Sequence, residues 1–290
     1  MRHSNISRAR RGFTLIELLV GIVIFAIVGA LFTKLVTVQG KFYDRQGMGN
    51  AARNVSRASL NRVVSDFRMI EATGGVIAAT STSLTIRVPF AIGVVCGNNG
   101  AGTVLSLLPV DSTTFANAGF FGYAWRNFQT GAYSYVQNPA TEWNGIASDI
   151  AVCTARQITT VPNARIVHIE PAVPPVAGLG TPVFLYSNVT YAFQPSTAVP
   201  GMVGLYRTTI MPNGPRPSEE LVAPFANTAS WKFFTVNGGS VPQTNPPAAL
   251  SDIRGLELHL DGLSENRAPG MVSNESAPFI TAVFFKNRTN

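Results

Sequence analysis

The first 88 residues contain no proline, although the whole chain has 19. Proline is the strongest helix breaker, so nothing in this stretch prevents one long helix. The chain also has only two cysteines and three histidines, and their spacing fits no metal or redox motif. These scarcities argue against a metal centre or a thiol-based active site.

Acidic residues are also scarce, with 15 Asp and Glu against 22 Lys and Arg, for a net charge of +7. The basic excess is confined to the first 73 residues, because residues 74–290 hold 11 basic and 11 acidic side chains. A nucleic-acid-binding domain needs a basic surface of its own. The sequence therefore predicts no nucleic-acid partner for the C-terminal part.

One long apolar run is present, at residues 13–33. Its 21 residues span the ~30 Å hydrocarbon core of a bilayer at ~1.5 Å per residue. The basic leader, residues 1–12, has four arginines and no acid, which keeps the N-terminus cytoplasmic. No small-residue cleavage site of the Ala-x-Ala kind follows Phe32, so an ordinary secretory signal is disfavoured.

A single carboxylate, Glu17, lies within this run. A carboxylate at the centre of a membrane costs ~2.5–3.5 kcal/mol on insertion scales, so we expect Glu17 to have a function. A plain signal anchor would explain the span and its orientation equally well. It would not explain Gly12 immediately before Phe13, or the position of the carboxylate.

Gly-Phe-Thr-Leu-Ile-Glu at residues 12–17, after a short basic leader, resembles the processing site of type IV prepilins and type II secretion pseudopilins. The resemblance implies that a prepilin peptidase/methylase cuts between Gly12 and Phe13 and methylates the new amine of Phe13. It also implies that Glu17 neutralises such an amine during assembly. The implied partners are this enzyme, inner-membrane lipid, and other major and minor pilins or pseudopilins through helix packing.

The helix is expected in two halves, a transmembrane half at residues 13–38 and a periplasmic half at residues 39–73. In the second half, apolar residues recur at helical spacing and predict one buried stripe: Val55, Leu60, Val63, Val64, Phe67 and Ile70. Gly40, Gly47 and Gly49 predict a bend or frayed turn near residues 46–50, at ~1 kcal/mol each against Ala. The Gly74–Gly75 pair is expected to end the helix.

Residues 74–290 read as a β-rich globular head, because short runs alternate polar and apolar side chains between turn residues. The expected strands are 83–88, 165–170, 189–193, 204–210, 231–236, 255–260 and 280–285. The predicted fold class is therefore α+β and pilin-like, a long N-terminal helix packed on an antiparallel sheet. The order of the last elements resembles PilW-type minor pilins and the J-type pseudopilins. The length of the chain and the lack of an early helix proline favour a minor subunit.

Two cysteines, Cys96 and Cys153, bracket an insert in the head. In an oxidising periplasm we expect a disulfide closing a 58-residue loop, worth ~4 kcal/mol, with two buried thiols as the alternative. Residues 97–152 hold nine aromatic and only four charged side chains. Trp125 and Trp143 would form a contact surface, or the insert would bury its own aromatics as a small sub-domain.

Other patterns in the head indicate no catalytic chemistry. Gly97–Gly102 lacks the Lys-Ser/Thr of a phosphate-binding loop. His259 and Asp261 share one face of a strand, but no nucleophile is placed beside them. Asp261, Glu265 and Asn266 lack the ligand spacing of a calcium loop. We expect no enzyme, no cofactor and no metal.

These observations predict a minor pilin or pseudopilin anchored by a single pass in the inner membrane, with a periplasmic head that later reaches a filament tip or the cell surface. One alternative is a tip adhesin that binds through the aromatic insert. Another is a DNA-uptake pilin with a local basic stripe. The sequence does not distinguish a type IV pilus from a type II secretion system or a competence machine.

Overall fold

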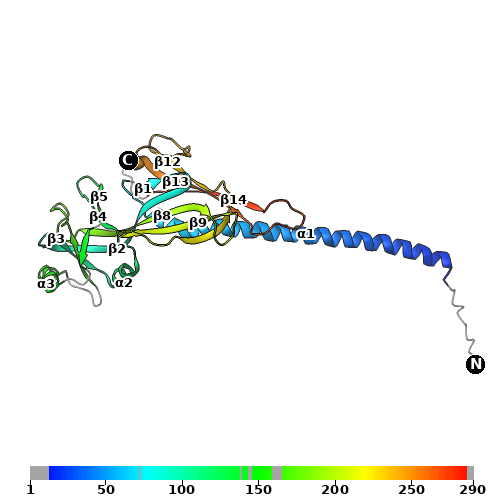
Figure 1. Cartoon of the computed structure of the whole chain (residues 1–290), viewed down its shortest axis with the longest axis horizontal. Helices are drawn as coiled ribbons and strands as arrows, with labels where there is room; N and C mark the ends of the chain where they lie inside the picture. Colours follow the sequence, from blue (N-terminus) through cyan, green and yellow to red (C-terminus); the bar gives the residue numbers. More distant parts are fainter. Residues whose placement is uncertain (1–12, 72, 138, 143–145, 159–164, 286–290) are drawn as a thin grey trace, which may run out of the picture.

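The computed structural model describes residues 13–71, 73–137, 139–142, 146–158 and 165–285. A single long helix projects from a β-rich head, so the described part of the molecule is elongated, and the helix begins at Leu15, at the end remote from the head (Figure 1). The predicted α+β fold, a long N-terminal helix packed on an antiparallel sheet, is confirmed.

Helix α1 runs without interruption from Leu15 to Arg68, 54 residues or ~81 Å. Every residue from Phe13 to Gly47 is exposed, and we call this part the stalk. From Ala52 onward one face of the helix is buried against strands β11, β13 and β14. The helix is therefore free at one end and part of the head at the other.

Two expectations about this helix are wrong. No frayed turn occurs near residues 46–50, because Gly47 and Gly49 both lie within the uninterrupted helix. The helix also ends at Arg68, with Met69 as its C-cap, rather than at the Gly74–Gly75 pair. The chain turns away earlier because the side chain of Ile70 is fully buried in the head.

Most of the head is one antiparallel sheet of 14 strands, whose main path has the order β12-β13-β11-β9-β8-β2-β3-β7-β6. The longest strands, β2 (Ser83–Asn99) and β8 (Pro182–Pro195), pair with each other and run through the length of the head (Figure 1). The other strands of the path are β3 (Gly102–Leu107), β6 (Ala140–Glu142), β7 (Ile166–Glu170), β9 (Val203–Met211), β11 (Glu219–Phe225), β12 (Ser230–Thr235) and β13 (Ile253–Leu263).

The remaining elements extend this path. Five further strands lie off this path: β1 (Val76–Ala79), β4 (Gly122–Arg126), β5 (Tyr133–Gln137), β10 (Gly214–Pro215) and β14 (Ser276–Phe284). Two short helices, α2 (Pro109–Asn117) and α3 (Ala147–Ala155), and the 3-10 turn η1 (Leu250–Asp252) complete the fold. Each of the seven strands expected from alternation falls on an observed strand.

The head has two main hydrophobic cores along the same sheet. The proximal core lies under α1, where Phe67 meets the rings of Tyr191 and Trp231 with centroids 5.4 and 5.6 Å apart. The distal core lies at the end of the head remote from the stalk and includes Tyr123 and Trp125. The long strands β2 and β8 contribute to both cores and so join them.

Candidate functional site

The first turn of α1 is closed by a capping box between Thr14 and Glu17. The Thr14 hydroxyl accepts the backbone N–H of Glu17 at 3.3 Å. In return, one carboxylate oxygen of Glu17 accepts the Thr14 backbone N–H at 3.0 Å and the Thr14 hydroxyl at 2.9 Å. Two otherwise unpaired N–H groups are thereby satisfied, which fixes where the helix begins.

This arrangement gives Glu17 a structural role beside the predicted assembly role. Its carboxylate is held at the positive end of the helix dipole and next to the backbone of Thr14. Phe13, which precedes Thr14, is 83% exposed. Gly12 lies outside the described residues. The Thr-x-x-Glu spacing before an apolar run is a capping-box signal that sequence reasoning missed.

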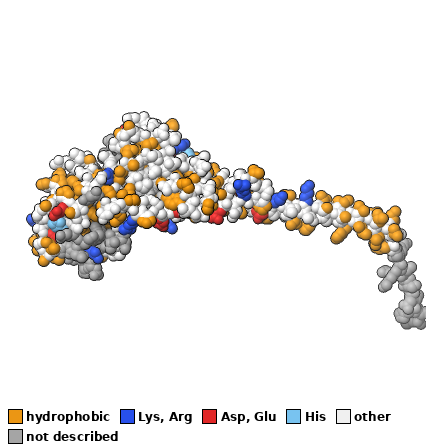
Figure 2. Space-filling view, viewed as in Figure 1, with side chains coloured by type: hydrophobic (Ala, Val, Ile, Leu, Met, Phe, Trp, Pro, Cys, Tyr) orange, Lys and Arg blue, Asp and Glu red, His pale blue; other side chains and the backbone are white. Residues whose placement is uncertain are grey.

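The exposed side chains of the stalk are mostly apolar over residues 13–38, with Glu17 and Lys34 as the charged exceptions (Figure 2). Within the described residues, α1 is the one helix long and apolar enough to cross a membrane, and none of its apolar window is buried. A helix that is hydrophobic all round is expected to be buried in lipid or against other helices. No described part of the chain packs against this surface.

The buried end of α1 approaches the sheet unusually closely through small side chains. Ala52, Ser56 and Ser59 face the sheet and are at most 1% exposed. The Ser56 hydroxyl donates to the carbonyl of Leu260 at 2.7 Å and accepts the N–H of Gly262 at 3.0 Å. One helix side chain therefore pairs with two backbone groups of β13 and fixes the register of helix on sheet.

A second polar contact lies nearer the end of α1. The Tyr191 hydroxyl donates to Asp66 of the helix at 2.5 Å and accepts from Arg207 Nε at 3.3 Å. Burial raises the pKa of Tyr191, and the neighbouring Asp66 carboxylate raises it further, so the phenol stays protonated as a donor. The helix, β8 and β9 are joined by this chain of three side chains.

Glu220 on β11 organises the turn after β8. It accepts hydrogen bonds from the backbone N–H groups of Thr197 and Ala198, both at 3.0 Å, and from the hydroxyls of Ser196, Thr197 and Tyr206. Partial burial alone would raise its pKa, but these hydrogen bonds outweigh that effect and lower the pKa to about 2. Glu220 is therefore a structural carboxylate that stays ionised.

The disulfide between Cys96 and Cys153 is present in the structure, with an S–S distance of 1.96 Å. It joins β2 to α3, and both cysteines are fully buried. Trp125 is 8% exposed and packs in the distal core, so it belongs to a core rather than to an exposed contact surface. Trp143 lies outside the described residues.

The bracketed segment does not form a core of its own. Its aromatics Tyr123 and Trp125 pack with Val167 of β7 and with Val183 and Leu185 of β8, all beyond Cys153. This differs from the expectation of a self-contained sub-domain, because β4 pairs with β8 and draws the insert into the main sheet.

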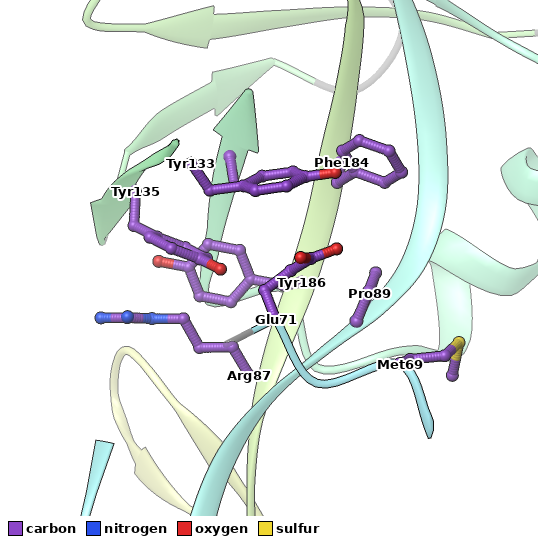
Figure 3. Close-up of a pocket in the computed structure, with 9 residues that line it drawn as sticks. Met69, Glu71, Arg87, Pro89, Tyr133, Tyr135, Phe184 and Tyr186 are labelled. Atoms are coloured by element: carbon purple, nitrogen blue, oxygen red, sulfur yellow. The ribbon is translucent and has the colours of Figure 1, made fainter. Parts of the chain in front are cut away.

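An aromatic pocket lies where the chain leaves α1 and meets the distal part of the head (Figure 3). The Arg87 guanidinium lies 4.4 Å from the centroid of the Tyr135 ring and 5.5 Å from that of Tyr186, and it also donates to the Gly74 carbonyl. The residues that line this pocket are Met69, Glu71, Arg87, Pro89, Ala124, Tyr133, Tyr135, Phe184 and Tyr186.

The volume of this pocket is about 40 Å³, well below the ~300 Å³ at which small-molecule sites begin. Burial raises the pKa of Tyr133, and so, to a smaller degree, does the Glu71 carboxylate, which is hydrogen-bonded to the phenol. The Arg87 guanidinium already lies over the rings of Tyr135 and Tyr186. The pocket residues therefore pack the chain segment after α1 against the distal part of the sheet rather than bind a ligand.

The remaining candidate residues are engaged in local contacts. His259 Nε2 lies 2.5 Å from Glu257 Oε1, and Asp261 accepts the Thr228 hydroxyl at 2.5 Å, so the structure does not join them in a reactive pair. His168 Nδ1 lies 3.2 Å from the buried Asp149. No group of three or more potential metal-ligating side chains occurs among the described residues.

Residues 7–33 match the family model described as the prokaryotic N-terminal methylation motif. The match includes the end of the leader, the capping box and the whole apolar run of residues 13–33. No curated protein and no solved structure matches the chain significantly. The motif and the fold are thus the two independent observations that bear on what the chain does.

Proposed function

We propose that this chain, whose N-terminal methylation motif supports membership of the type IV pilin and pseudopilin family, is a minor subunit of a type IV pilus or type II secretion pseudopilus. The observation that carries the proposal is the motif placed at the start of an uncovered apolar helix. The length of the chain and the absence of an early helix proline support a minor rather than a major role.

The first step in this function is processing at the membrane. The peptidase cuts between Gly12 and Phe13, and the amine of Phe13 becomes the new N-terminus and is methylated. That amine is one residue from Thr14, whose own N–H bonds to Glu17. Because consecutive Cα atoms are only ~3.8 Å apart, the capping box keeps the Glu17 carboxylate within reach of the new positive charge.

The second step is packing of the stalk against other subunits. In lipid, the pairing of Glu17 with an amine is much stronger than in water, because the dielectric constant is low. Once the stalk leaves the bilayer, its apolar surface must be covered by the stalks of neighbouring subunits. The head keeps its packing against the C-terminal half of α1 during this step, because hydrogen bonds from Ser56 and within the Asp66–Tyr191–Arg207 chain join the sheet to the helix.

Processing is tested by mass spectrometry of the protein purified from its native host. We expect a mature chain that begins with N-methylated Phe13, and we expect Gly12→Val to accumulate as an uncut precursor in the membrane. An intact Met1 in the mature protein, or a cut beyond the apolar run, would contradict the proposal.

The role of the Glu17 charge is tested with two matched variants. Glu17→Gln retains a side chain able to complete the capping box but removes the charge. Thr14→Val removes the hydroxyl cap but retains the charge. We expect both to be cut normally, and only Glu17→Gln to be missing from sheared or purified filaments by immunoblot. If Glu17→Gln enters filaments at the parental level, the proposed charge neutralisation does not operate in this subunit.

The tip-adhesin alternative needs an exposed aromatic patch on the insert. Trp125 is buried in the distal core, so that residue gives the alternative no support. Assembly through the stalk therefore remains the function that the described residues favour.

A further inference from the structure

A second hollow in the head has the volume of a small-molecule site. It has a volume of about 320 Å³, within the ~300–1,000 Å³ range of ligand pockets. It lies between the proximal and distal cores, with walls from β2, β8, β9 and the end of α2. Its lining residues are Val88, Phe90, Thr114, Ala118, Gly119, Ser187, Arg207, Thr209 and Arg216.

The polar side of this pocket is positively charged. Both charged residues in its lining are arginines, Arg207 and Arg216, and no carboxylate is among the nine lining residues. Three hydroxyl side chains, Thr114, Ser187 and Thr209, complete the polar surface. The head as a whole has equal numbers of basic and acidic residues, so two arginines in one hollow are a local concentration of positive charge.

Arg207 is held in a fixed orientation before any ligand arrives. Its Nε donates to the Tyr191 hydroxyl at 3.3 Å and its Nη1 donates to the Thr209 hydroxyl at 3.1 Å. A guanidinium carries five N–H donors, so these two bonds leave donors for a further acceptor. A preorganised side chain loses less freedom when it binds, which favours affinity.

Two acidic residues lie near Arg207 and reduce, without removing, its charge. Asp66 Oδ2 is 3.8 Å from Arg207 Nη2, beyond hydrogen-bond length, and Asp66 already accepts from Tyr191. Glu219 lies opposite Arg207 on β11 and is exposed to solvent. The second arginine, Arg216, is placed by its backbone N–H, which donates to the Thr209 carbonyl at 2.9 Å.

We propose that this pocket binds a small ligand bearing an oxyanion, a carboxylate, sulfate or phosphate group, on the scale of an acidic monosaccharide. The two guanidinium groups bind the anion, because charge-assisted hydrogen bonds from arginine suit planar and tetrahedral oxyanions. The three hydroxyls pair with the polar groups of the ligand, and Phe90 and Val88 cover an apolar face. No other segment described in the structure occupies this space.

The test uses the full chain in a nonionic maltoside detergent, since phosphocholine detergents would themselves supply phosphate. Binding of sodium phosphate, sodium sulfate and sodium glucuronate is measured by isothermal titration calorimetry at constant ionic strength set with chloride. We expect one site per chain. Tighter binding of glucuronate than of the inorganic ions identifies an acidic sugar as the class of ligand, and equal binding identifies a free oxyanion.

Three variants test the location of the site. Arg216→Gln is expected to weaken binding about ten- to hundredfold, the range for loss of a hydrogen bond to a charged group. Arg207→Lys keeps a positive charge beside Asp66, and so keeps the fold, but loses the forked geometry and weakens binding as well. The control Arg267→Gln changes an exposed arginine outside the pocket and should bind as the parent does.

The proposal is overturned if none of the three probes binds the parent chain. It is also overturned if binding persists unchanged in both Arg216→Gln and Arg207→Lys, or if Arg267→Gln weakens it equally, because the binding is then nonspecific. None of these results depends on filament assembly, so the outcome is independent of the function proposed above.

Discussion

Gly262 on β13 lies directly against the backbone of α1, and we predict that Gly262→Ala pushes helix and sheet apart. An added Cβ would lie 2.3 Å from the Ala52 carbonyl oxygen and 2.6 Å from Ser56 Oγ. The first of these atoms belongs to the helix backbone and cannot rotate away. The only relief is a movement of α1 relative to β13, which weakens the Ser56 hydrogen bonds.

The expected cost has two parts. Overpacking a tight site costs ~1–3 kcal/mol, and each weakened hydrogen bond adds ~0.5–1.5 kcal/mol. A loss of about 2–4 kcal/mol in the free energy of unfolding corresponds to about 5–15 °C in melting temperature for a head of this size. Ser56→Ala should act in the same direction, because it leaves the Gly262 N–H and the Leu260 carbonyl without their partner.

The assay is thermal unfolding in nonionic detergent, followed by near-ultraviolet circular dichroism. Gly178→Ala is the matched control, since its Cβ would meet only the Pro175 carbonyl, at an ordinary 3.5 Å. If Gly262→Ala melts with the parent, or shifts no more than Gly178→Ala, the helix is not clamped to β13 as described.

Three further predictions concern the head. Replacing Cys96 and Cys153 by alanine should lower the free energy of unfolding by ~4 kcal/mol in urea titrations, and reduction of the parent should reproduce the loss. Trp125→Ala should cost ~3–5 kcal/mol, whereas Phe128→Ala, 65% exposed, should cost little; comparable melting of the two would contradict the core assignment. Because folding lowers the pKa of Glu220 from 4.5 to about 2, its stabilisation is present above about pH 4.5 and is lost as the pH falls to 2. The parent should therefore exceed Glu220→Gln in stability at neutral pH, with a gap that closes over that range; a gap independent of pH would refute this.

Sequence reasoning found the strands in which polar and apolar side chains alternate along the chain. Gly255–Leu260 and Val189–Phe193 alternate because side chains point to opposite faces of the sheet. Seven observed strands were not predicted: β1, β3, β4, β5, β6, β10 and β11. Two of them, β3 and β4, are almost wholly buried on both faces and therefore show no alternation. The membership of Trp125 in the distal core depends on β4 pairing with β8, which no local pattern indicates.

The helix stripe was also only partly predictable. Val63, Phe67 and Ile70 are buried as periodicity predicts. The N-terminal part of the buried helix face is instead formed by the small residues Ala52, Ser56 and Ser59. Serine there satisfies backbone groups of β13 that lie more than 200 residues away in the sequence. The arginine pocket arises in the same way, from residues of separate strands that only the sheet brings together.

The two long strands that run through both cores also determine how the head would respond to tension. β2 and β8 lie roughly along the long axis of the molecule (Figure 1), and the bonds of an antiparallel ladder are perpendicular to its strands. A pull along the helix therefore loads many of these bonds in shear at once, rather than opening them one after another. We therefore expect the β2–β8 ladder to resist an axial pull by shear rather than to unzip.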